Sequence, residues 1–271
     1  FDLAMVMNPQ WFGIEDSVSD PAAIKAMRYS FVTVGIWWIV FSQYTFYYMP
    51  KGNKKEGERD HLLLNGIKEL RIVYAKLSES PRLKSFLNAF FVYGMAVQTI
   101  MLVAAFYGEE KIAWGSDEMR TTGLIISMLV IQLVAIIGAT LTAKASSRYG
   151  NIPVLILINI IWICICIYAF FMETPTEFYT AAGFVGMVMG GIQALSRSTY
   201  SKLLPETEDT ASYFSFYDVA EKIGIVIGTF IYGAIAQITG DIKFAIIILG
   251  LFFIIGALLL TRVNKKALSL N

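Results

Sequence analysis

The sequence predicts an all-α protein whose helices cross a lipid bilayer several times. Of its 271 residues, 56% are hydrophobic and only 16% are charged, and the mean hydropathy is +0.59. The apolar residues stand in long blocks, with the charges between them. A helix rises ~1.5 Å per residue, so roughly 20 apolar residues cross a ~30 Å hydrocarbon core. Blocks of this length exclude the short alternating strands of a membrane barrel and leave a polytopic helix bundle.

Seven blocks satisfy this length criterion. The first covers residues 29–49 and is followed by Pro50. The other six follow one another closely, at residues 83–107, 121–143, 152–172, 178–200, 212–238 and 242–261. Short connections make consecutive helices antiparallel neighbours. The expected parts are an extracytoplasmic segment 1–28, a transmembrane helix 29–50, a cytoplasmic linker 51–82, a six-helix unit 83–262 and a cytoplasmic tail 263–271.

Positive charges are distributed unevenly between alternate loops. The richer set includes the linker and the C-terminal tail, whereas the opposite set holds only Lys25, Arg28, Lys111, Arg120 and Lys243. Cytoplasmic loops carry the excess of Lys and Arg in membrane proteins. The C-terminus is therefore expected on the cytoplasmic side, and the N-terminal segment on the opposite side.

The linker contains one amphipathic helix. Its apolar residues recur at spacings of four and three, at Leu63, Ile67, Leu70, Tyr74 and Leu77. Such a helix can lie on the membrane surface with its lysines toward anionic headgroups. We expect this arrangement on the membrane surface; the alternative is an ordinary linker helix packed on the bundle.

One span, a long linker and six further spans match the plan of major facilitator transporters. These proteins have two six-helix halves, each built from inverted three-helix repeats. On this plan the first span is helix six, the last six spans are the complete C-terminal half, and helices one to five are expected upstream.

Four stretches carry a resemblance to one group of these transporters. They are FLNAFFVYGMAVQTI at 86–100, VIQLVAIIGATLTAKASSRYG at 130–150, GGIQALSRSTYSKLLP at 190–205 and FSFYDVAEKIGIVIG at 214–228. The chain resembles the "unknown major facilitator" family, which includes autophagy-related vacuolar amino-acid effluxers and many bacterial permeases. The resemblance implies a secondary transporter without a cofactor, working by alternating access in the bacterial inner membrane, with amino acids as the suggested solute.

Two positions depart from the family pattern. Members commonly carry Asp-Gly in helix seven, where this chain has Met95 and Ala96. The loop after helix eight usually holds Asp-Arg, but here Ser147 precedes Arg148. The first departure argues against a charged group in helix seven, and the second removes an acidic partner from Arg148.

Five residues are candidates for the solute pathway because they stand near mid-depth of their spans. They are Tyr93, Gln98, Gln132, Asn159 and Trp162. Polar side chains at this depth are costly unless they face a cavity or another helix, and transporter sites lie near the midplane. A neutral pocket lined by amides and aromatic rings suits a small polar solute. The alternative role is hydrogen bonding between helices.

A second candidate group is a charge network at the cytoplasmic ends of the helices. Asp218 and Lys222 are one turn apart and can pair within their helix. Arg197, on the preceding helix, is expected to reach Asp218 or Glu221, and Arg148 is counted with the same network. We expect either a gate whose ion pairs break during transport or a static clamp at the helix ends.

Glycines recur at helical spacing in two of the spans. Gly186, Gly190, Gly191, Gly224 and Gly228 let helix backbones approach closely. Close packing is therefore their expected role.

Enzymatic and nucleic-acid functions find no support in the sequence. His61 is the only histidine, which excludes sites that need several imidazoles, and no metal is expected. No P-loop, zinc-protease helix or serine elbow is present. The expected partners are the bilayer, a small solute and a coupling proton or ion. Two alternatives to amino-acid transport stay open: a sugar, peptide or drug permease, and a membrane subunit or scaffold that does not transport.

Overall fold

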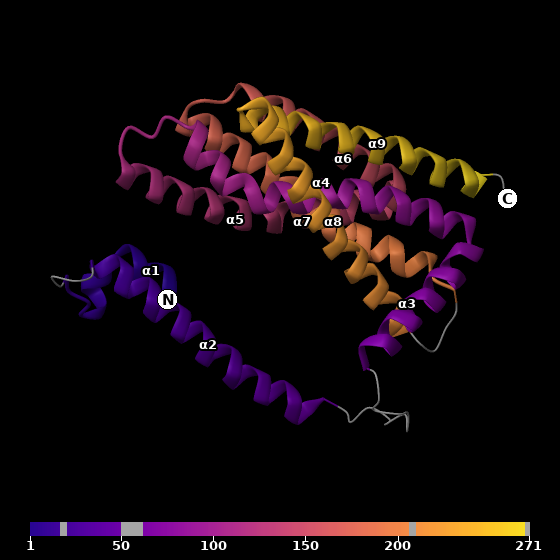
Figure 1. Ribbon diagram of the computed structural model, residues 1–271, viewed down its shortest axis with the longest axis horizontal. Helices are drawn as coiled ribbons and strands as arrows, with labels where there is room; N and C mark the ends of the chain where they lie inside the picture. The colour runs from indigo at the N-terminus through magenta and orange to yellow at the C-terminus, as the bar shows by residue number, and fades with distance from the viewer. Residues whose placement is uncertain (17–20, 50–61, 206–209, 269–271) are drawn as a thin grey trace. The chain divides into compact units, whose positions relative to one another are not determined.

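The computed structural model describes residues 1–16, 21–49, 62–205 and 210–268, and within these ranges the chain is helical and contains no strand. The elements are α1 (Asp2–Met7), a 3-10 helix η1 (Pro9–Phe12), α2 (Ala22–Tyr48), α3 (Leu62–Glu79), α4 (Pro81–Lys111), α5 (Asp117–Tyr149), α6 (Asn151–Phe171), α7 (Pro175–Leu203), α8 (Thr210–Thr239) and α9 (Ile242–Leu268) (Figure 1). Seven of them, α2 and α4 to α9, are long and apolar enough to cross a membrane. The predicted all-α polytopic bundle is confirmed.

The chain divides into two compact units, Phe1–Asp60 and His61–Asn271. In the first unit, α1 and η1 fold back on the start of α2. Met5, Ile14 and Ala26 are buried together there, and the Thr33 hydroxyl donates to the Asp2 carboxylate at 2.7 Å. This unit is thus a single membrane-spanning helix with a short helical segment packed at its N-terminal end.

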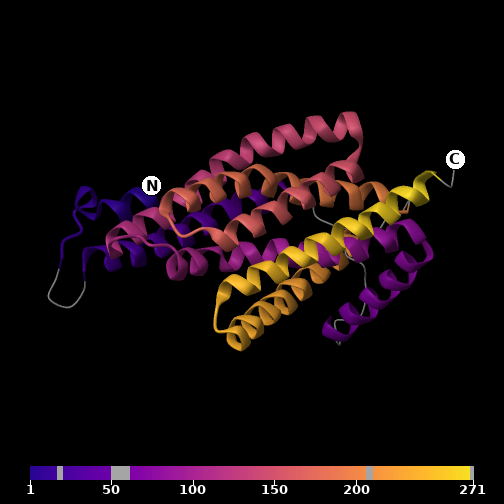
Figure 2. The same cartoon turned by 90° about the horizontal axis from the view of Figure 1, so that it is seen from above.

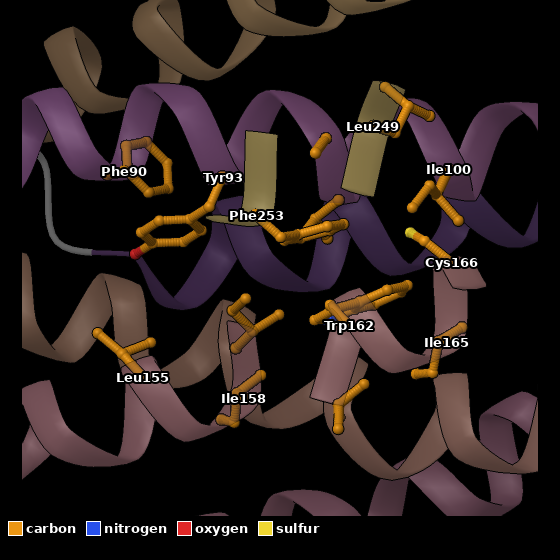
Figure 3. Close-up of a cluster of buried hydrophobic side chains, with 14 of the residues drawn as sticks. Phe90, Tyr93, Ile100, Leu155, Ile158, Trp162, Ile165, Cys166, Leu249 and Phe253 are labelled. Carbon is orange, nitrogen blue, oxygen red and sulfur yellow. The ribbon is translucent and has the colours of Figure 1, made fainter. Parts of the chain in front are cut away.

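The second unit contains the six-helix bundle α4 to α9. Its most extensive packing joins α5 to α7, α6 to α9 and α4 to α9. In Figure 1 the helices α4, α5 and α9 run roughly lengthwise, whereas α8 crosses them obliquely; Figure 2 shows the same bundle from above. In the core, the indole ring of Trp162 stacks on the Phe253 ring with centroids 5.2 Å apart and planes inclined by 7° (Figure 3). Aromatic stacking of this kind joins α6 directly to α9.

Capping residues set where several of these helices begin. Thr174 and Glu177 form a capping box at the start of α7, in which Glu177 accepts from the Thr174 backbone N–H at 2.9 Å. Ser116 caps α5 by accepting from the Met119 N–H at 3.2 Å. At the other end of α5, Gly150 has a φ of +85°, a conformation that L side chains rarely adopt, and this lets α6 begin at once. The short predicted connections follow from these signals.

Glycines bring α5 and α7 into backbone contact. A Cβ added at Gly138 would lie 2.0 Å from the Met187 carbonyl oxygen, and one at Gly186 would lie 2.7 Å from the Ile131 carbonyl oxygen. On α8, a Cβ at Gly228 would lie 2.1 Å from the Thr99 hydroxyl oxygen of α4. The predicted packing role is confirmed at Gly186 and Gly228, whereas Gly224 makes only ordinary contacts.

Helix α3 is a packed linker helix. It contacts α4 and α8, and its residues Val73 and Leu77 are 4% and 1% exposed within the same core as the bundle. Of the two interpretations of its amphipathic pattern, the structure therefore supports packing on the bundle. The side chains of Leu63 and Ile67 lie outside what the structure describes.

Candidate functional site

A cavity of about 350 Å³ lies between α4, α7 and α8. It is lined by Phe90, Tyr93, Gly94, Val97, Gln98, Ile192, Gln193, Ala194, Ser196, Arg197, Tyr217 and Glu221. The lining combines a carboxylate, a guanidinium group, amides and hydroxyls with aromatic rings. Two of the predicted pathway residues, Tyr93 and Gln98, and two of the predicted network residues, Arg197 and Glu221, meet here.

The buried side of the cavity is built from hydroxyl groups and stacked rings. Ser196 donates to the Ile192 carbonyl at 2.6 Å, so the Tyr93 hydroxyl is the donor in its 2.7 Å hydrogen bond to Ser196. The rings of Phe90 and Tyr217 stack with centroids 4.2 Å apart. These contacts hold α4, α7 and α8 in fixed register around the cavity.

Glu221 gives the cavity a half-buried carboxylate. Its Oε1 accepts a hydrogen bond from Gln98 Nε2 at 2.6 Å, which joins α8 to α4. Within the described part of the chain, Glu221 forms no ion pair. Among the described residues, the hydrogen-bond partner of its carboxylate is thus the neutral amide of Gln98.

Arg197 lies at the edge of the cavity and pairs with Asp218. The two side chains, 57% and 53% exposed, approach to 2.9 Å, and the guanidinium also lies 5.6 Å from the centroid of the Tyr217 ring. An exposed pair of this kind contributes only ~0.2–1 kcal/mol. It can therefore exchange partners at little cost.

Two expectations for the charge network are wrong. Asp218 faces Arg197 on α7, and no ion pair between Asp218 and Lys222 is present among the described residues, where Lys222 is exposed. Arg148 is exposed at the end of α5, with its guanidinium 5.4 Å from the centroid of the adjacent Tyr149 ring. A helical spacing of four permits pairing, but here the partner on the neighbouring helix is the one that Asp218 contacts.

Three predicted pathway residues lie away from this cavity. Gln132 is exposed on α5. Asn159 and Trp162 are fully buried in the core between α4, α6 and α9. Asn159 donates to the Leu155 carbonyl at 2.8 Å, while its Oδ1 and the Trp162 Nε1 have no partner among the described residues. None of the three lines the cavity.

Ser196 and Tyr217 line the cavity but were not predicted from the sequence. Ser196 directly precedes the predicted Arg197, and Tyr217 directly precedes the predicted Asp218. Ser196 carries no charge, and an aromatic residue near the end of a span suggests an interfacial position. Nothing in the one-dimensional pattern marked them as cavity residues.

A second set of charged groups joins the opposite ends of these helices. Lys111, at the end of α4, lies 3.1 Å from Asp241, and Lys243 lies 3.2 Å from Glu173. The Lys243 backbone N–H donates to Asp241, and together with the nearby Lys111 ammonium it holds the pKa of the Asp241 carboxyl below its usual value. These contacts tie the α8–α9 connection to α4 and the α6–α7 connection to α9.

Among the described residues, no three side chains of His, Cys, Asp or Glu gather in a group that could hold a metal ion. His61 lies outside the described residues.

The comparison with known proteins decides the family. Residues 11–268, nearly the whole chain, match the family described as vacuole effluxer Atg22 like. The chain belongs to that family. It is also similar to the uncharacterized MFS-type transporter YxiO of Bacillus subtilis, with 31% identity over 97% of the chain and 59% of that protein. Two fungal relatives are both named autophagy-related protein 22. The protein of Yarrowia lipolytica is 21% identical over 88% of the chain and 44% of its own length. The protein of Pichia angusta is 26% identical over 82% of the chain and 45% of its own length.

The Atg22-like family is a family of membrane transporters, and this chain is a multi-pass integral membrane protein of that family. It spans about half the length of the relatives that it matches. The activity, solute and partners of the whole protein are therefore matters for a proposal.

Proposed function

We propose that the chain forms the C-terminal part of a secondary transporter that moves amino acids by alternating access. In this proposal α2 is helix six, α3 belongs to the linker between the halves, and α4 to α9 are the second half. The order of one span, a linker helix and six spans supports it. So does the similarity to an MFS-type transporter along nearly the whole chain.

The observation that carries the proposal is the chemistry of the cavity between α4, α7 and α8. An amino acid presents an ammonium group, a carboxylate and a side chain. The cavity presents the Glu221 carboxylate, the Arg197 guanidinium and the stacked rings of Phe90 and Tyr217. We assign the ammonium to Glu221 and the carboxylate to Arg197, which would release Asp218 as the solute binds.

Glu221 is also the candidate for coupling to a proton. It is a cavity carboxylate that accepts from the neutral amide of Gln98 and has no cationic partner among the described residues. A cavity carboxylate with no cationic partner among the described residues offers its oxygen to either a proton or the ammonium group of a solute. In this account the two compete for one carboxylate, which would couple solute movement to a proton gradient.

The proposed location is the bacterial inner membrane, with the C-terminus in the cytoplasm. The excess of Lys and Arg in one set of loops supports this orientation. The cavity would then open toward the cytoplasm, and the Lys111–Asp241 and Lys243–Glu173 contacts would lie at the outer face.

Solute binding to the purified full chain tests the proposal. Thermal unfolding in detergent is followed with amino acids, sugars and nucleosides, and a bound solute raises the transition temperature. Neutral L-amino acids are expected to stabilise the protein. Arg197→Ala should weaken their binding by ten- to hundredfold, because a hydrogen bond to a charged group contributes ~1.5–3 kcal/mol.

Arg148→Ala is the matched control, since Arg148 is exposed outside the cavity. It removes the same charge and should leave binding unchanged. Stabilisation by sugars or nucleosides and not by amino acids would assign a different solute. Equal losses in both variants would contradict the assignment of the site.

A further inference from the structure

A second concave surface lies between α3, α4 and α8 and shares no lining residue with the solute cavity. It has a volume of about 260 Å³. Its walls are mostly apolar and include Leu87 and Phe91 of α4 and Val219 and Ile223 of α8. Ile223 is 49% exposed, so the groove is open on its α8 side. We refer to it below as the α3–α8 groove.

The charged and amide side chains of the groove are gathered at one end. Lys84 and Asn88 lie one turn apart on the same face of α4 and are both exposed. Lys84 stands in the first turn of the helix, whereas Phe91 lies two turns further along it. Within the described residues Lys84 forms no ion pair. The groove thus has a cationic end and an apolar body.

The groove changes from charged to apolar in the same direction as a bilayer changes from headgroups to hydrocarbon. The membrane-spanning helix α4 begins at Pro81, so Lys84 stands where the apolar span meets the polar region. The start of α4 is also the positive end of its helix dipole, which adds to the positive charge of Lys84. An amphiphile with an anionic head and an apolar chain matches both the charge and the direction of the groove.

We propose that the α3–α8 groove binds one anionic phospholipid, with its phosphate group at Lys84 and an acyl chain along Leu87, Phe91 and Ile223. Basic pockets between membrane helices bind anionic headgroups in this way. This site is separate from the solute cavity, and its occupancy does not depend on the proposed transport function.

The headgroup decides which lipid binds. Acyl chains are as apolar as the side chains of the groove, so a chain leaves the bilayer for the groove with little gain from the hydrophobic effect. The Lys84 contact distinguishes anionic from zwitterionic lipids. One lysine near the membrane surface favours an anionic lipid by about fivefold.

Native mass spectrometry of the full chain measures this preference directly. The protein is released from detergent micelles that contain equal amounts of palmitoyl-oleoyl phosphatidylglycerol and palmitoyl-oleoyl phosphatidylcholine. One phosphatidylglycerol is expected to stay bound, about fivefold more often than phosphatidylcholine. Lys84→Gln should bring the ratio close to one, while Lys144→Gln, an equal change at an exposed lysine of α5, should leave it unchanged.

A second variant fills the groove without changing its charge. Ala220→Phe places a ring between α4 and α8 and should reduce the binding of both lipids. Val226→Phe is its control, because Val226 is exposed elsewhere on α8. A folded, monodisperse Lys84→Gln protein keeps the test valid if Ala220→Phe does not fold.

Several results would overturn the proposal. Equal binding of the two lipids by the wild type would remove the role of Lys84, and so would equal losses in Lys84→Gln and Lys144→Gln. Unchanged lipid binding in Ala220→Phe would place the lipid elsewhere. If the wild type has the mass of two chains and Ala220→Phe has the mass of one, the groove is an interface between copies of the chain.

Discussion

The contact between α5 and α7 gives a sharp prediction for Gly138→Ala. The new Cβ would lie 2.0 Å from the Met187 carbonyl oxygen and 2.6 Å from the carbonyl carbon, both of them backbone atoms. Ordinary contact begins at about 3.4 Å, so the two helices must separate by more than an ångström. Overpacking of this kind costs ~1–3 kcal/mol. Because ~1 kcal/mol shifts the melting temperature of a chain this size by ~2–4 °C, we expect a loss of ~2–12 °C.

Gly183→Ala provides the matched control for this prediction. It places the same methyl group on α7, at a glycine whose added Cβ would meet nothing within 4 Å. Alanine is also the better helix former, so this variant should melt at or slightly above the wild-type temperature. Thermal unfolding of the three proteins in one detergent gives the comparison. Equal melting temperatures for Gly138→Ala and Gly183→Ala would refute the close approach of α5 and α7.

Three further predictions concern polar groups. The folded-state pKa of Asp241 is lowered, so its carboxylate stabilises the fold above the free value of ~3.9, and this contribution is lost as pH falls through the folded value. Asp241→Asn should therefore melt below the wild type at pH 7, and the gap should shrink as the pH falls below ~3.9. A gap that is constant with pH would contradict the lowered pKa of Asp241. Tyr93→Phe removes one buried hydrogen bond to Ser196 and should cost ~1 kcal/mol in the free energy of unfolding, measured by denaturant titration; no change would mean that the bond does not form. Trp162→Phe removes an N–H that has no partner among the described residues. Its cost in the free energy of unfolding should therefore be much smaller than the ~3–5 kcal/mol expected for Trp162→Ala. Similar costs for the two variants would show that the N–H is hydrogen-bonded.

Depth along a helix could be predicted from the sequence, and the direction in which a side chain points could not. The rise per residue is constant, so the lengths of the spans and the positions of Arg197 and Asp218 near one end follow from counting. Gln132 and Gln98 have similar predicted depth, yet Gln98 lines the cavity and Gln132 is exposed. Apolar residues surround Gln132 on α5, so no periodic pattern marks an inward face.

Partners on other helices could be predicted only in part. The expected contact of Arg197 with Asp218 is confirmed, whereas the pair of Asp218 and Lys222 that their spacing suggests does not form among the described residues. Trp162 packs in the core, because its ring stacks on Phe253 of α9. The most extensive packing joins helices that are not consecutive, such as α5 and α7, and a single sequence does not contain that tertiary property.

Solute protection of a cysteine in the cavity tests the central claim most directly. Ala194 lines the cavity and is exposed, and Cys164 is exposed whereas Cys166 is buried, so Ala194→Cys is made in a Cys164→Ser background. Ser147→Cys, at an exposed position on α5 outside the cavity, is the control. A charged, water-soluble thiol reagent should label both, and L-leucine should slow the labelling of Ala194→Cys only. Equal labelling rates with and without amino acids at Ala194→Cys would contradict a solute site between α4, α7 and α8.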